Sequence, residues 1–243
     1  APPGLKVVRF VPDLARVFRI ALGADGSVWF AGRRGLVHRS PDGALRTFNP
    51  ATTGGAMPYI EVRDVAVDKA GAVWIARVHD WWNRPGGSGL SRYDPATDAW
   101  RTFTAADGLP DERVVSVTLD GDGAVWAGTV GGAVRLDPSR LTWQAAALGG
   151  EPRVPIPAQF VAQGPDGSVW IAGYDGAAQR RADGTWRVFR AELAHRRVNC
   201  ITFDADGNVW FATWGGLSRW TPSDESWLHV RRTDLPGKLL SNG

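Results

Sequence analysis

Hydrophobic residues along the chain occur in short runs that alternate with polar residues, and Gly, Asp or Pro separates one run from the next. In the clearest stretch, alternation over 198–203 is followed by the turn Asp204-Ala205-Asp206-Gly207 and by a second run over 208–213. Alternation of this kind is typical of half-buried β-strands. No window shows the sustained 3.6-residue periodicity of a helix. The pattern therefore predicts an all-β protein.

The phrase Gly-x-Val-Trp occurs five times, and this repetition predicts the architecture. Its tryptophans are Trp29, Trp74, Trp126, Trp170 and Trp210. They are 45, 52, 44 and 40 residues apart, which fits one four-stranded β-propeller blade per repeat. We expect a single domain over residues 1–243 with five blades, at about 16–49, 62–104, 114–146, 158–190 and 198–231.

The two ends of the chain raise the question of how the ring closes. Residues 5–10 resemble an extra outer strand of the fourth-strand type, and residues 233–242 resemble the loop that precedes a first strand. Either the terminal strand closes a five-bladed ring, or the chain is a piece of a larger propeller. We expect the closed ring, because an open one leaves a long unpaired edge that is prone to association.

Composition excludes several classes of function. The net charge is +3, and the 25 arginines are spread along the chain instead of forming one basic run, which argues against a nucleic-acid partner. The single cysteine, Cys200, excludes an internal disulfide and a Cys-based metal site. No apolar run is long enough to span a bilayer. The chain opens with Ala1 and without Met, so we expect a processed or trimmed product, which leaves the loss of an export signal as an open alternative.

No metal or cofactor site is expected from the motifs. The four histidines are scattered, and the Asp-rich turns at 120–123 and 204–207 lack the further oxygen ligands of a calcium loop. Hairpin formation explains these aspartates. The chain also has no Gly-rich phosphate loop and no nucleophile elbow.

Several longer motifs resemble those of a known family. Gly89-Leu90-Ser91-Arg92-Tyr93-Asp94-Pro95, Trp100-Arg101-Thr102-Phe103-Thr104 and Asp107-Gly108-Leu109-Pro110 are similar to the two-component regulator propeller repeat. The pattern also resembles the propeller of streptogramin (virginiamycin B) lyases. The first resemblance implies an extracytoplasmic, periplasmic or secreted sensor propeller, often one that responds to carbohydrates. It does not itself identify a function, because function depends on sites grafted onto the fold.

The blade topology predicts where a ligand binds. Loops between second and third strands and loops between blades emerge on one face, and the Asp-Gly hairpins emerge on the other. The loops of the first face differ from blade to blade, whereas the scaffold alone would tolerate the same residue in each. The candidate ligand-binding residues on this face are Arg33, Arg34, Tyr59, His79, Asp80, Trp81, Trp82, Arg84, Tyr174, Asp175, His195 and Trp214.

The tryptophans divide into a structural and a candidate group. Trp81 and Trp82 lie in an insertion over 77–88, where flat aromatic rings next to polar side chains suit a sugar; a loop that simply caps the channel is the equally weighted alternative. We expect inter-blade packing for the tryptophans at repeated positions, namely Trp29, Trp74, Trp100, Trp126, Trp143, Trp170, Trp186, Trp210 and Trp227.

Three functions remain open at this point. The first is a non-catalytic, ligand-binding or sensor propeller for a carbohydrate or another small molecule. The second is a propeller lyase or hydrolase, with His79, His195 and Glu61 as the catalytic candidates. The third is a scaffold that binds a protein partner. We favour the first, because no pair of catalytic groups is brought together by the sequence alone.

Overall fold

The computed structural model describes residues 14–57, 61–77, 89–137, 139, 141–146, 157–231 and 234. Over these ranges the chain forms twenty β-strands and one short 3₁₀ turn. The strands make five antiparallel four-stranded sheets, each with its strands in sequence order. The prediction of an all-β propeller with five blades is confirmed. In the described part of the chain, no helix is long and apolar enough to cross a membrane.

Each blade is a meander of four strands. Blade 1 comprises β1 (Val17–Leu22), β2 (Val28–Gly32), β3 (Gly35–Arg39) and β4 (Leu45–Phe48). Blade 2 comprises β5 (Val62–Val67), β6 (Val73–Arg77), β7 (Gly89–Asp94) and β8 (Ala99–Phe103). Blade 3 comprises β9 (Val114–Leu119), β10 (Val125–Thr129), β11 (Gly132–Asp137) and β12 (Thr142–Ala145). Blade 4 comprises β13 (Ala158–Gln163), β14 (Val169–Gly173), β15 (Gly176–Arg180) and β16 (Trp186–Phe189). Blade 5 comprises β17 (Val198–Phe203), β18 (Val209–Thr213), β19 (Gly216–Thr221) and β20 (Ser226–Val230).

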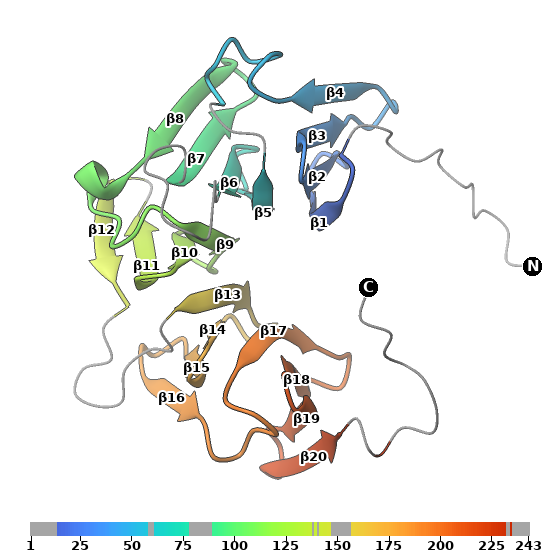
Figure 1. Cartoon of the computed structure of the whole chain (residues 1–243), viewed down its shortest axis with the longest axis vertical. Helices are drawn as coiled ribbons and strands as arrows, with labels where there is room; N and C mark the ends of the chain where they lie inside the picture. Colours follow the sequence, from blue (N-terminus) through green and yellow to red (C-terminus); the bar gives the residue numbers. More distant parts are fainter. Residues whose placement is uncertain are drawn as a thin grey trace, which may run out of the picture.

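The blades are arranged around an axis that their first strands line (Figure 1). Each first strand packs against the first strand of the next blade, from β1 through β5, β9 and β13 to β17. Within the described residues, no comparable packing joins β17 back to β1. The strand over 5–10, on which the expected closure of a five-bladed ring depends, lies outside the described residues.

In blades 2, 3 and 5, the turn between the first and second strands depends on an aspartate six residues before the repeated tryptophan. The Asp204 carboxylate accepts hydrogen bonds from the Asp206 and Asn208 amides at 3.1 and 2.9 Å and from Trp210 Nε1 at 2.8 Å. Hydrogen bonds from Trp210 and Asn208 lower the pKa of Asp204 to about 2. Gly207 completes the turn at φ +80°, a value that a side chain disfavours. Asp68 and Asp120 hold Trp74 and Trp126 in the same way.

Tryptophans interlock neighbouring blades in a fixed direction. The second-strand tryptophans of blades 1 to 4 are at most 2% exposed and belong to four apolar clusters, one at each junction between blades. The fourth-strand tryptophans reach back to the preceding blade. Ring centroids of Trp100 and Phe48 are 5.9 Å apart, and those of Trp227 and Phe189 are also 5.9 Å apart. The predicted packing role of these repeated tryptophans is confirmed at the four junctions.

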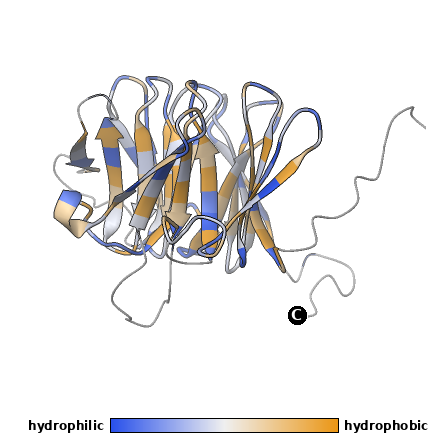
Figure 2. Ribbon diagram, turned by 90° about the horizontal axis from the view of Figure 1, so that it is seen from above, coloured by the Kyte–Doolittle hydropathy of each residue, from blue (hydrophilic) through white to orange (hydrophobic). Residues whose placement is uncertain are grey.

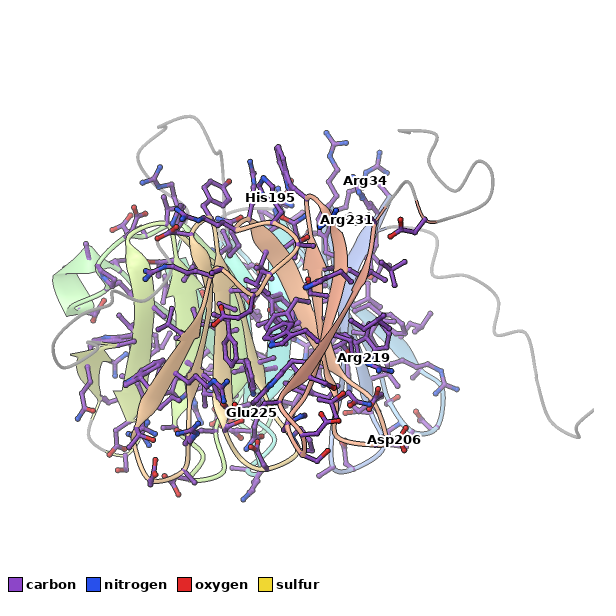
Figure 3. All side chains as sticks on the ribbon, turned by 90° about the horizontal axis from the view of Figure 1, so that it is seen from below. Arg34, His195, Asp206, Arg219, Glu225 and Arg231 are labelled. Carbon is purple, nitrogen blue, oxygen red and sulfur yellow. The ribbon has the colours of Figure 1, made fainter. Side chains whose placement is uncertain are left out.

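Turns and loops gather on two opposite faces of the molecule. Hydrophobic residues follow the strands, and hydrophilic residues are frequent in the turns at both faces (Figure 2). Arg34, His195 and Arg231 lie on one face, which we call the loop face, and Asp206 and Glu225 lie toward the other, which we call the hairpin face (Figure 3). The predicted separation of inter-blade loops from Asp-Gly hairpins is therefore correct for the labelled residues.

Removal of the Asp120 carboxylate tests the aspartate anchor. Asp120 is 7% exposed, and it accepts hydrogen bonds from Trp126 Nε1, Arg135 Nε and the Ala124 amide, each at 2.9 Å. Because Asp120→Ala leaves these donors without an acceptor, we expect the free energy of unfolding to fall by about 3 kcal/mol in urea titrations. Asp122→Ala is the matched control, since the Asp122 side chain is 88% exposed; its effect should stay within about 0.5 kcal/mol. Equal effects of the two changes would contradict the anchor.

Candidate ligand-binding site

Three segments of the loop face converge at the junction of blades 4 and 5. The turn between β14 and β15 carries Tyr174 and Asp175, and the turn between β18 and β19 carries Trp214. The loop between β16 and β17 carries residues 195–197. Its backbone is bonded to both turns, because the Arg196 carbonyl accepts from the Gly176 amide at 2.7 Å and the Arg197 carbonyl accepts from the Trp214 amide at 3.1 Å. These backbone bonds fix the relative positions of the side chains.

The centre of this cluster is a guanidinium group between two aromatic rings. Arg197 Cζ lies 4.0 Å from the centroid of the Tyr174 ring and 3.7 Å from that of the Trp214 ring. Cation–π contacts of this kind are favourable and hold the rings in place. Even so, Trp214 remains 62% exposed and Tyr174 37% exposed. The result is an ordered aromatic surface that is open to solvent.

His195 lies next to this surface and is oriented by the backbone. Its Nδ1 accepts a hydrogen bond from the Arg197 amide at 2.9 Å, and its ring lies nearly parallel to that of Trp214, with centroids 6.5 Å apart. Because Nδ1 is the acceptor, the neutral imidazole carries its hydrogen on Nε2. His195 therefore offers a hydrogen-bond donor to a ligand, and its basic nitrogen is already engaged.

Charged side chains form the edge of the cluster. Asp175 pairs with Arg190, Nε to Oδ2 at 3.2 Å, and with Arg196, Nη1 to Oδ1 at 3.7 Å. Arg190 Nε also donates to the Asp175 carbonyl at 3.1 Å. Two guanidinium groups therefore pair with one carboxylate. The edge can both donate hydrogen bonds to hydroxyl or anionic oxygens and accept them at Asp175.

Three other predicted site residues lie within the described ranges, namely Arg33, Arg34 and Glu61, and they lie outside this cluster. Arg33 and Arg34 are exposed in the β2–β3 turn of blade 1, and Arg34 lies on the loop face (Figure 3). Glu61 pairs with Arg63 Nε at 2.7 Å, so its carboxylate is engaged in an ion pair. The remaining predicted residues lie outside the described residues: Tyr59, His79, Asp80, Trp81, Trp82 and Arg84.

Three arginines of this cluster, Arg190, Arg196 and Arg197, are not among the candidate binding residues selected from the sequence, although Arg196 and Arg197 follow His195 in a loop assigned to the ligand face. Arginine also precedes the first strand at Arg16 and Arg113, and it therefore reads as part of the repeat. The sequence signal that distinguishes the blade 4–5 junction from the other junctions is the first residue of the turn between the second and third strands. That position is Arg33 in blade 1 and Val130 in blade 3, but it is aromatic in the consecutive blades 4 and 5.

A second polar cluster fills the axis. At one equivalent position in each first strand stand Arg19, Asp64, Ser116, Phe160 and Cys200. Asp64, 3% exposed, accepts from Arg19 Nε at 2.8 Å and from Ser116 Oγ at 2.7 Å. Arg19 Cζ also lies 4.7 Å from the centroid of the Phe160 ring. Because these contacts join blades 1 to 4, we assign the cluster to stability.

Two clefts lie on the hairpin face. One, of ≈350 Å³, is lined by Asp25, Trp29, His38 and Lys69, where partial burial lowers the pKa of His38. The other, of ≈480 Å³, lies between the hairpins of blades 2 and 3. Across the described ranges, no three His, Cys, Asp or Glu side chains are grouped to hold a metal ion.

A double-mutant cycle tests the Arg197 sandwich. From Arg197→Ala, Trp214→Ala and the double variant, we expect a coupling energy of about 1 kcal/mol in thermal or urea unfolding, since the guanidinium stacks on the ring. The same cycle with Arg196→Ala is the control, because the Arg196 side chain is 70% exposed and pairs with Asp175. A coupling for Arg197 no larger than that for Arg196 would show that the stacking does not exist in solution.

Comparison with known proteins supports the repeat assignment. The model of the two component regulator propeller family matches residues 108–131 and 192–215, which confirms the resemblance on those segments. Each match runs from an inter-blade loop to the end of the second strand, and the second match contains His195, Arg197 and Trp214. A search of curated proteins gave no match.

Solved structures with the same fold include sensor and lyase propellers. The extracellular domain of a protein from B. thetaiotaomicron, described as a hybrid two component system, has a TM-score of 0.69 at 20% identity, over 88% of this chain and 29% of that one. Virginiamycin B lyase from Staphylococcus aureus has a TM-score of 0.66 at 16% identity, over 90% of this chain and 72% of that one. At these identities the likeness shows the fold alone. This chain is similar to a segment of each propeller, and the match spans less than a third of the B. thetaiotaomicron protein.

Proposed function

We propose that the chain is a non-catalytic, ligand-binding propeller domain of the sensor type, with its binding site at the blade 4–5 junction of the loop face. The observation that carries this proposal is the exposed Trp214 ring held against Arg197. A large aromatic side chain that is ordered yet 62% exposed has no packing role of its own at that position. Its order comes from neighbours that leave the ring accessible.

The ligand class that fits this site best is a carbohydrate. Sugar rings present apolar C–H faces, which stack on aromatic side chains, and hydroxyl groups, which need both donors and acceptors. Trp214 and Tyr174 supply the aromatic surface. His195 Nε2 and the guanidinium groups of Arg190 and Arg196 supply donors, and Asp175 supplies an acceptor.

The comparisons add support at the level of the domain. The segment that matches the two component regulator propeller model, 192–215, supplies four of the cluster residues, namely His195, Arg196, Arg197 and Trp214. The similar structure from B. thetaiotaomicron is an extracellular domain, and we propose an extracytoplasmic location for this chain as well. Catalysis by His195 is less favoured, because its Nδ1 already accepts a backbone hydrogen bond.

Titration of the purified chain against a panel of neutral and acidic oligosaccharides tests the proposal. For any sugar that binds, Trp214→Ala should weaken the affinity at least about tenfold, because it removes the stacking surface. Leu141→Ala is the control, since Leu141 is also exposed, at 43%, but lies on blade 3. Binding that survives Trp214→Ala unchanged would move the site elsewhere on the propeller. Failure of every sugar to bind, together with capture of a protein by the loop face, would support the scaffold function instead.

A further inference from the structure

We propose that the two end sheets of the propeller are docking surfaces, and that each receives a further four-stranded blade of the same Gly-x-Val-Trp repeat carried by the same polypeptide. The inference rests on side-chain burial and is independent of the ligand site. We call the sheet face that meets the following blade the trailing face, and the face that meets the preceding blade the leading face.

The four junctions inside the chain define what these faces bury. The trailing face of blade 2 contributes Trp74, Leu90 and Phe103, which are at most 1% exposed. The leading face of blade 3 contributes Val117 and Val125, at 3% and 0%. A trailing face with Trp, Leu and Phe thus meets a leading face with β-branched residues. The contacts are apolar and exclude water.

Blade 5 has the trailing face of the repeat, but nothing in the described chain covers it. Leu217 is 42% exposed, whereas Leu36 and Leu90 at the equivalent position are fully buried. Trp210 is only half-buried, whereas the equivalent tryptophans of the other four blades are at most 2% exposed. Leu228, on the same face, is 43% exposed.

The leading face of blade 1 is uncovered in the same way. Ile20 is 54% exposed, whereas its equivalents Val65 and Ile201 are 4% and 2% exposed. Leu22 is 73% exposed, and Leu45, at the position of Trp100, is 52% exposed. Both ends therefore present apolar surface that the inner blades bury, as expected where a further blade docks.

The chemistry of each face identifies its occupant. Blade 5 presents the Trp and Leu of a trailing face, so its partner must offer the β-branched leading face of a blade. Blade 1 presents a leading face, so its partner must offer the Trp and Leu of a trailing face. A second copy offers both faces too, but copies joined head to tail generate open assemblies unless the rotation closes.

The comparison with the S. aureus lyase gives the size of the missing part. The five blades match 72% of that structure, so the remainder of that propeller corresponds to roughly two blades at this repeat length.

The test extends the full chain after its last residue by a second copy of residues 61–146, which supplies two blades of the same repeat. If the end faces are docking surfaces, the extended chain should be monomeric and its Tm should exceed that of the unextended chain by at least about 5 °C. The matched control is the extended chain with Ile20→Arg and Leu217→Arg. It should lose the gain, because the charges would be buried at both new junctions.

The unextended chain with the same substitutions provides a second, independent measurement. Ile20→Arg and Leu217→Arg should change its Tm by no more than about 2 °C, because both side chains are exposed, whereas Leu90→Arg should unfold it. Strong destabilisation by Ile20→Arg or Leu217→Arg would mean that the chain already covers its ends, and would overturn the proposal. Concentration-dependent oligomers abolished by Leu217→Arg would overturn it in favour of a second copy. An extension that leaves Tm unchanged would overturn it as well.

Discussion

Apolar packing between consecutive blades is the interaction on which the rest of the structure depends. A four-stranded sheet has two faces, and a blade of this repeat is apolar on both. A single blade therefore cannot bury its own apolar surface and needs a neighbour on each side. At each of the four junctions, the tryptophan of the second strand is buried against the next blade, and the fourth-strand tryptophan of that next blade reaches back to the preceding one. In blades 2, 3 and 5, the hydrogen bond that the tryptophan indole donates to an aspartate fixes the orientation of the ring.

This packing also determines where chemistry can occur. The sheet faces of the strands pack at the junctions, and the turns and loops at the two faces of the molecule differ most readily between blades. At the blade 4–5 junction, two turns and one loop are tied together by backbone hydrogen bonds. The side chains that project from them are consequently ordered without being buried. An ordered, exposed combination of aromatic and charged groups is the usual basis of recognition by a rigid scaffold.

The repeat made the fold predictable from sequence, whereas the site was predictable only in part. Positions such as Trp126 and Gly207 recur in every blade, so their roles follow from periodicity and from turn chemistry. Tyr174, Asp175, His195 and Trp214 were predicted because they differ between blades in loops of one face. Their convergence on Arg197 could not be predicted, because it depends on the spatial placement of adjacent blades. The role of Asp120, two residues before the Asp of the Asp-Gly turn, was also missed, since a carboxylate that anchors an indole and one that forms a turn look alike in a sequence.

Hydroxyl-radical footprinting of the tryptophans measures the central claim most directly, because it reports the accessibility of each ring in solution. Among the tryptophans of the described ranges, directional packing predicts the fastest oxidation at Trp214, an intermediate rate at Trp210, and strong protection of Trp74, Trp126 and Trp170. If Trp210 were as protected as Trp170, its face would be covered in this chain. If Trp126 or Trp170 reacted as fast as Trp214, the blades would not interlock as described, and the account would be wrong.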